Sequence, residues 1–83
     1  MDVVLHPHAR ARLIERGVTE EEVISTVTGG ERVAEKFGRV GFRRHFSYGQ
    51  IWRGKRYATK QVEVIAVEES SQWLLITVIA RYF

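Results

Sequence analysis

From residue 31 onward, the chain carries four stretches rich in β-branched and aromatic residues, with only short breaks between them. These stretches are residues 32–37, 42–48, 57–68 and 73–81. Parallel neighbours need crossovers of about a dozen residues or more, so strands this close in sequence form an antiparallel meander. The most apolar stretch, 73–79, is predicted to be the central strand, buried on both faces. Residues 49–54 are predicted to form a basic loop, and residues 69–72 a hairpin turn.

The segment before these strands shows the signals of a first helix. Pro7 suits the first position of a helix that runs to about Arg16. Gly17 suits the left-handed residue that follows a helix end. The apolar run at residues 3–5 predicts a short strand before the helix. On a helical wheel, the buried side of this helix holds Ala9, Leu13 and Ile14.

A second helix has the clearest start signal in the chain. Thr19 is its predicted N-cap, and Glu22 three residues later completes a capping box. Val18 is expected to pack onto Val23 as a hydrophobic staple. The glutamates at 20–22 face the positive end of the helix dipole, so we interpret them as structural. The helix is predicted to end at residues 29–30 and to bury Val23, Ile24 and Val27.

These patterns predict an α+β fold with two N-terminal helices packed on a four- to five-stranded antiparallel sheet. Eighty-three residues make one domain, 1–83. The chain has no cysteine and only three histidines, so neither a metal nor another cofactor is expected. Its longest apolar run, 73–80, is far shorter than the ~20 residues of a membrane helix. We therefore expect a cytoplasmic protein without a membrane partner.

The charge distribution is strongly uneven. The formal net charge is +3, yet residues 36–60 hold eight Lys or Arg and no Asp or Glu. Six of the nine aromatic residues lie in the same segment. Clustered cations with interleaved aromatic rings suit a nucleic acid, whereas the alternative is a solvated hairpin whose charges protect a sheet edge. The predicted nucleic-acid contacts are Arg16, Arg39, Arg43, His45, Arg53, Lys55 and Arg56.

Two candidate sites for chemistry follow from helix and strand periodicity. On the first helix, His8, Arg12 and Arg16 form an i, i+4, i+8 row. A phosphate between the arginines would relieve their repulsion, and His8 could exchange a proton near neutral pH. The alternative is a solvated helix face in which Glu15 neutralises Arg12.

On the strand at 42–48, alternation separates Arg44, which lies among aromatic residues, from Arg43 and His45. Burial of the aromatic face would constrain Arg44 as a phosphate clamp. The opposite register would turn the rings into an exposed stacking platform, and both registers remain open. Lys60 interrupts an apolar strand face and is a further candidate cation. Tyr82 is a second candidate for proton transfer, although the C-terminal residues could equally close the hydrophobic edge.

Several short motifs, taken together, resemble a known family. They are His8-Ala9 with Arg12, the block at 15–23, Gly38-Arg39, Tyr57 with Lys60 and Val62, and 76–78. The chain resembles a bacterial and archaeal family of domains of unknown function that is related to RelE-like and BrnT-like toxins. The resemblance implies a RelE/barnase-like helix and sheet fold and, by analogy, RNA cleavage without a metal.

The leading hypothesis is therefore a toxin-type, metal-independent endoribonuclease in which a ribose 2′-hydroxyl attacks the adjacent phosphate. Arg12, Arg44 and Lys60 would clamp the phosphate, while His8 and Tyr82 would transfer protons. Its partners would be RNA, free or ribosome-bound, and an antitoxin protein whose acidic or amphipathic segment covers the basic face. One alternative is a nucleic-acid or protein-binding module without chemistry. Another is a homodimer formed through a strand edge or Trp52.

Overall fold

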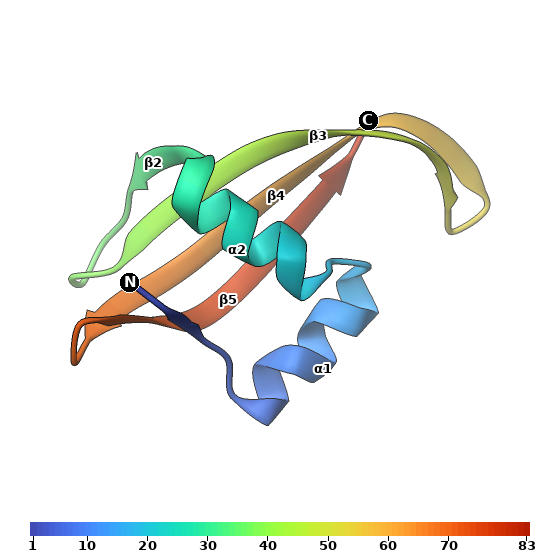
Figure 1. The fold of residues 1–83 in the computed structure, drawn as a ribbon. Helices are drawn as coiled ribbons and strands as arrows, with labels where there is room; N and C mark the ends of the chain where they lie inside the picture. Colours follow the sequence, from blue (N-terminus) through green and yellow to red (C-terminus); the bar gives the residue numbers. More distant parts are fainter.

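The computed structural model describes all 83 residues and has two layers, with both helices on one face of a five-stranded sheet (Figure 1). In chain order, the elements are β1 (Val3–Val4), α1 (Pro7–Arg16), α2 (Glu20–Gly29), β2 (Glu31–Ala34), β3 (Val40–Trp52), β4 (Lys55–Glu69) and β5 (Gln72–Tyr82). The predicted α+β class and the two N-terminal helices are confirmed. Each helix has ten residues, and neither is long and apolar enough to cross a membrane.

The sheet is mixed, with the order β1-β5-β4-β3-β2. Strands β2 to β5 form the predicted antiparallel meander, whereas β1 pairs in parallel with β5. The central strand is β4, so the prediction that 73–79 would be central and buried on both faces is wrong. The apolar residues of β5 instead reflect its position between β4 and α1, and Ile76 is exposed.

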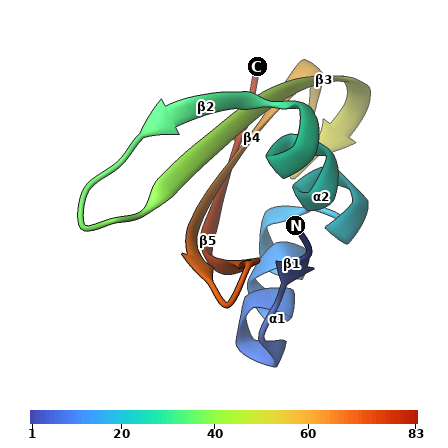
Figure 2. The same ribbon diagram turned by 60° about the vertical axis from the view of Figure 1, so that its left-hand side comes forward.

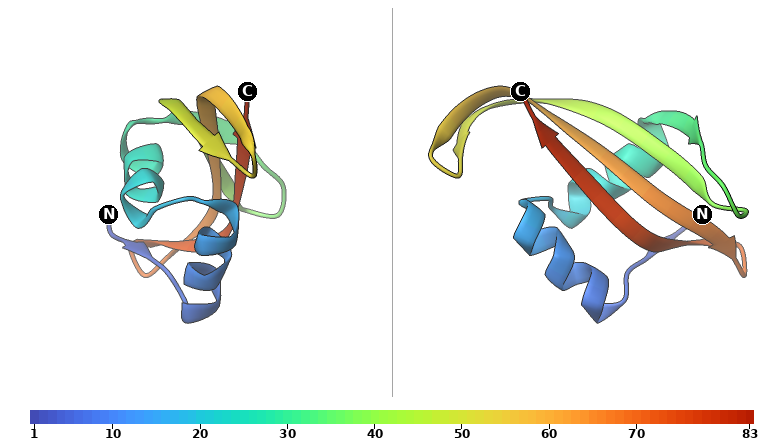
Figure 3. Two further views of the ribbon diagram at one scale, coloured as in Figure 1. Left: turned by 90° about the vertical axis from the view of Figure 1, so that its right-hand side faces the viewer. Right: turned by 180° about the vertical axis from the view of Figure 1, so that it is seen from behind.

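Seen from behind, the strands lie in front of the helices, and no other element covers this face (Figure 3, right). Figure 2 shows both helices on the opposite side, with α1 close to β5 and β1. We call the uncovered side the open face. Because side chains alternate along a strand, every second residue of β3, β4 and β5 points to the open face, except at the register shifts near residues 47–50 and 65–66.

The β3–β4 hairpin is longer than predicted, and the expected loop at 49–54 is wrong. The two strands continue to a turn at Arg53 and Gly54, whose φ angles of 50° and 84° are typical of tight hairpin turns. A bulge between Ser47 and Gln50 includes Gly49 at φ 61° and interrupts the register. The hairpin end beyond this bulge, residues 48–57, is here called the basic arm. The predicted turn at 69–72 is confirmed.

The helix caps follow the sequence closely. Gly17 is left-handed at φ 69°, and its N–H donates to the carbonyl of Ile14. The capping box is present, with Thr19 and Glu22 each accepting from the other's backbone N–H at 3.0 and 2.9 Å. Gly30 follows the last residue of α2 as its C-cap and is extended, so β2 starts without a left-handed turn.

The core lies between the helices and the sheet, and ten buried apolar residues form it. They are Leu13, Val18, Val23, Val27, Phe42, Val62, Val64, Ala66, Leu75 and Val78. Two predicted core residues are exposed, Ile14 at 80% and Ile24 at 46%. Each helix packs on the sheet through a narrow stripe of residues, centred on Leu13 in α1 and on Val23 in α2. Ile14 and Ile24 come one residue later, so each points about 100° away from that stripe.

Candidate functional site

The structure settles which face of the 42–48 strand is buried. Phe42 lies opposite Val64 on the helix-covered side and is buried. Arg44 lies opposite Val62 on that same side, while Arg43 and His45 point to the open face. The two adjacent arginines are therefore separated by the whole thickness of the sheet.

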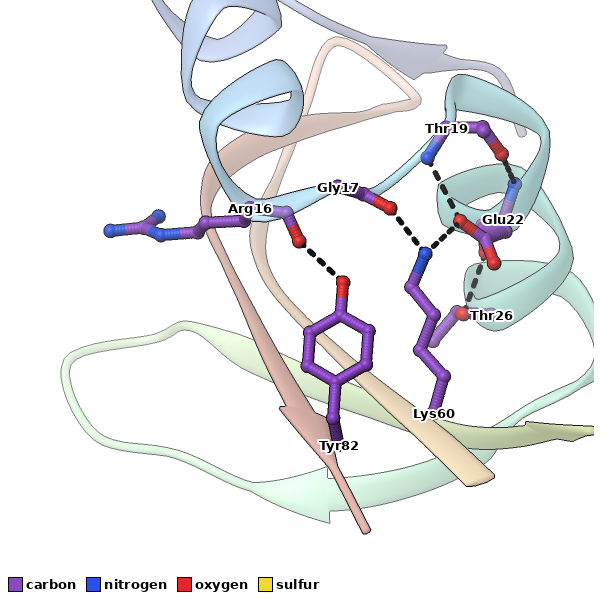
Figure 4. A network of polar contacts seen from close by, with 7 residues as sticks. All are labelled: Arg16, Gly17, Thr19, Glu22, Thr26, Lys60 and Tyr82. Carbon is purple, nitrogen blue, oxygen red and sulfur yellow. Dashed lines mark hydrogen bonds and ion pairs between the residues drawn. The ribbon is translucent and has the colours of Figure 1, made fainter. Parts of the chain in front are cut away.

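Lys60 lies on the covered side at the junction of the two helices. Its side chain is 3% exposed, and its Nζ donates to the carbonyl of Gly17 and, at 2.8 Å, to Oε1 of Glu22 (Figure 4). The Nζ also lies 5.6 Å from the ring of Tyr48 and 5.7 Å from the ring of Tyr82. An ammonium held by two oxygens and two aromatic faces is a structural cation that joins β4 to the helix connection.

Tyr82 completes this junction. Its hydroxyl donates to the carbonyl of Arg16 at 2.7 Å (Figure 4), and its ring stacks on Trp52 at 4.9 Å between centroids. Burial raises the pKa of Tyr82 to about 12, and the nearby Tyr48 and Glu22 add to the shift. The phenol is therefore protonated at neutral pH and anchors the end of α1.

Arg44 is anchored near the C-terminal end of α2. Its Nη1 donates to the carbonyl of Ser25 at 3.0 Å and to the Ser25 hydroxyl at 2.6 Å. The guanidinium also lies 5.6 Å from the ring of Phe46. A cation near the last turn of a helix complements the helix dipole, so these contacts stabilise the packing of α2 on the sheet.

His8 and Arg12 lie elsewhere, in a cavity between α1 and β5. Arg16, the third residue of their predicted row, donates to the carbonyl of Val78 at 2.8 Å. The structure therefore distributes the five predicted catalytic residues over three places: the α1–β5 cavity, the end of α2 and the Lys60 junction. It does not bring them together at one site.

The open face presents a different set of polar side chains. Glu63 lies directly opposite Arg43, and in the next row His45, Gln61 and Arg81 lie side by side across β3, β4 and β5. Ion pairs join Arg81 to Glu63 at 3.5 Å and Arg43 to Glu31, a residue of β2, at 2.9 Å. We call Arg43, His45, Gln61, Glu63 and Arg81 the open-face cluster.

Two further features shape the open-face cluster. The Glu63 side chain is only 13% exposed, so it is held among its neighbours rather than extended into solvent. The ring of His45 meets Phe83 edge-on, with 5.9 Å between centroids. Phe83 is itself exposed, so it presents an aromatic surface beside the imidazole.

Sequence reasoning did not single out Gln61 and Glu63 as candidates, and it included Arg81 only as the last residue of the stretch 73–81. The available signal was alternation, because 61 and 63 interleave with the apolar positions of β4. Alternation alone does not say which residues of β3 and β5 lie beside them. That information resides in the strand register.

The remaining predicted nucleic-acid contacts lie at both ends of β3. On the basic arm, Arg53 donates to the carbonyl of Glu15 at 3.1 Å, and Arg56 to that of Gly49 at 2.7 Å. Lys55, also on the arm, lies over the ring of Tyr57 at 5.5 Å. Arg39 is exposed beside the β2–β3 turn, at the opposite end of the strand.

Comparison with known proteins adds one relationship. Residues 5–80 match the profile of a family described as a domain of unknown function, DUF4258. No curated protein and no solved structure matches the chain. No three His, Asp or Glu side chains are grouped so that they could hold a metal ion.

Proposed function

The chain belongs to the DUF4258 family of domains of unknown function, and from that premise we propose that it is a metal-independent endoribonuclease whose active surface is the open face. The observation that carries the proposal is the open-face cluster. It combines one carboxylate, one imidazole and two guanidinium groups around an uncharged glutamine. Those are the group types that phosphodiester transesterification needs.

The strand register supports the proposal, because it sets these residues in adjacent rows of one face. Directly opposite residues have Cβ atoms about 5 Å apart, and diagonal neighbours about 7–8 Å. Glu63 is opposite Arg43 and diagonal to both His45 and Arg81, while Gln61 lies between the last two. A phosphate above Gln61 would therefore have a proton acceptor, a proton donor and two cations around it.

In the proposed mechanism, the Glu63 carboxylate accepts the proton of the ribose 2′-hydroxyl as this oxygen attacks phosphorus. The imidazole of His45 donates a proton to the departing 5′-oxygen. Arg43 and Arg81 donate hydrogen bonds to the non-bridging oxygens, where negative charge develops. The P–O5′ bond breaks, so the products are a 2′,3′-cyclic phosphate and a 5′-hydroxyl end.

RNA would also contact the flanking surface. Lys55 and Arg56 on the basic arm would release counterions from the backbone, and the exposed Phe83 would stack on a base beside His45. The same proposal includes kinship with RelE-like and BrnT-like toxins. An acidic antitoxin-type protein would then cover the open face, and native mass spectrometry of the purified protein would detect it.

The adjacent arginines provide a matched test. Labelled single-stranded RNA is incubated with wild type, Arg43→Ala and Arg44→Ala, and cleavage is followed on denaturing gels. Arg43→Ala is expected to slow cleavage at least tenfold, because it removes a charged hydrogen bond to the phosphate. Arg44→Ala changes a side chain on the covered face. This variant, if it is folded, should therefore cleave RNA at the wild-type rate.

The proton-transfer roles need separate variants. His45→Ala and Glu63→Gln should each lower the cleavage rate by about 10²–10⁴ while largely preserving RNA affinity. Cleavage that survives all three open-face substitutions, or that depends on His8 and Arg44 instead, would contradict the assignment. Salt-sensitive binding without cleavage would favour the alternative of a non-catalytic RNA-binding module.

A further inference from the structure

The cavity between α1 and β5 has the size of a small-molecule site. Its volume is about 360 Å³, within the usual range of ~300–1,000 Å³. One wall is the first turns of α1, and the other is the segment of β5 at 74–78. Figure 3 (right) shows α1 beside β5 at the margin of the sheet.

Strand pairing explains why space remains there. β1 pairs with β5 only at Trp73 and Leu74, so the next part of the β5 edge has no neighbouring strand. The first helix lies along that edge, and Arg16 satisfies the outward carbonyl of Val78. A helix cannot follow a strand edge as closely as another strand does, because its axis stands farther away. The space between them is the cavity.

The polar side chains of the cavity are uncommitted. Seven of the ten arginines donate a side-chain hydrogen bond within the protein, and an eighth, Arg32, lies over two aromatic rings. Arg12 makes no hydrogen bond, ion pair or ring contact, although Glu15 is three residues away on the same helix. His6 and His8 likewise have no hydrogen-bonding partner.

The opposite wall is apolar. The residues that line it are Leu74, Leu75, Ile76, Thr77 and Val78, four of which are apolar. One free guanidinium, two free imidazoles and an apolar wall suit a ligand with an anionic end and a flat, weakly polar body.

We propose that this cavity binds a phosphate monoester of mononucleotide size. The phosphate would lie against Arg12 and His8, and the ring system against Leu74 and Ile76. The free nucleotide and the phosphorylated end of an RNA chain share this chemistry. The inference does not depend on RNA cleavage at the open face, because it concerns other residues and a ligand without a scissile bond.

The test is a titration of ¹⁵N-labelled protein with uridine 5′-monophosphate, followed by amide NMR shifts. Saturable shifts are expected at residues 8–12 and 74–78, and uridine and inorganic phosphate should each bind more weakly. Arg12→Ala should weaken the binding of uridine monophosphate at least tenfold, because a charged hydrogen bond is lost. Arg10→Ala is the control, since Arg10 pairs with Glu20 outside the cavity.

Two results would overturn the proposal: no saturable shifts with either uridine or adenosine 5′-monophosphate, or binding that Arg12→Ala leaves intact. If Arg12→Ala unfolds the protein, Ile76→Trp replaces it, because the indole fills the cavity and should abolish the shifts. The ligand's source is distinguished with two short DNA oligonucleotides that differ only in a 5′-phosphate. Tighter binding of the phosphorylated one identifies a strand end, and equal binding identifies the free nucleotide.

Discussion

The ammonium of Lys60 lies 2.8 Å from Oε1 of Glu22, with only 3% of the lysine side chain exposed. Glu22 also accepts from the backbone N–H of Thr19, so the same carboxylate caps α2 and neutralises a buried cation of β4. One residue thereby couples the start of the second helix to the centre of the sheet.

Removing the buried cation should therefore be costly. Lys60→Ala leaves the Glu22 carboxylate and the Gly17 carbonyl without their partner, and we expect a loss of about 3 kcal/mol in the free energy of unfolding. Urea denaturation of wild type and variant measures this difference in unfolding free energy. The control is Arg10→Ala, which breaks the exposed pair with Glu20 and should cost less than about 1 kcal/mol. Equal losses in the two variants would show that burial of Lys60 contributes nothing.

Tyr82 should make stability depend on pH in the alkaline range. The folded protein retains the phenolic proton up to about pH 12, whereas an unfolded tyrosine loses it near pH 10. This contribution is fully present below about pH 10 and is lost as the pH rises through about 12. In Tyr82→Phe, the fall in melting temperature over this range should be smaller than in wild type. Tyr57→Phe, in the same aromatic cluster, should retain the wild-type fall.

Gly17 is expected to be the least replaceable of the left-handed glycines at turns. A Cβ there would lie 2.5 Å from Cζ3 of Trp52 and 2.8 Å from the Tyr82 hydroxyl, in addition to the strain of φ 69°. Gly38 is similar in φ, at 71°, but a Cβ there meets nothing within 4 Å. Gly38→Ala should cost about 1–2 kcal/mol and Gly17→Ala about 3 kcal/mol or more. Similar unfolding free energies for both variants would contradict the close packing of Trp52.

The basic arm should control the salt dependence of RNA binding. Replacing Lys55 and Arg56 by alanine removes two cations, and the slope of log affinity against log salt should fall by about 1.4 for single-stranded RNA. The comparison is Lys36→Ala with Arg39→Ala, which removes the same charge from the other end of β3. An equal change in slope for the two double variants would mean that RNA is not localised on the arm.

Local structure was the part most accessible from the sequence. The capping box at Thr19 and Glu22, the left-handed Gly17 and the turn at 69–72 all depend on contacts between residues close in the chain. Such contacts leave a signature in a few consecutive residues. The predicted burial of Ile14 and Ile24 was wrong because it depended on how much of each helix surface the sheet covers. The predicted central position of 73–79 was wrong because it depended on the order of the strands in the sheet.

The sequence by itself determined the helices, most of the strands and the concentration of positive charge in residues 36–60, because propensity, periodicity and composition are properties of neighbouring residues. Tertiary structure alone decided where each cation lies and what it contacts. It buried Lys60 against Glu22, turned Arg44 to the helices and Arg43 to the open face, and left Arg12 unpaired in a cavity. These outcomes depend on strand register and helix placement, and a shift of one residue would exchange the two faces of a strand.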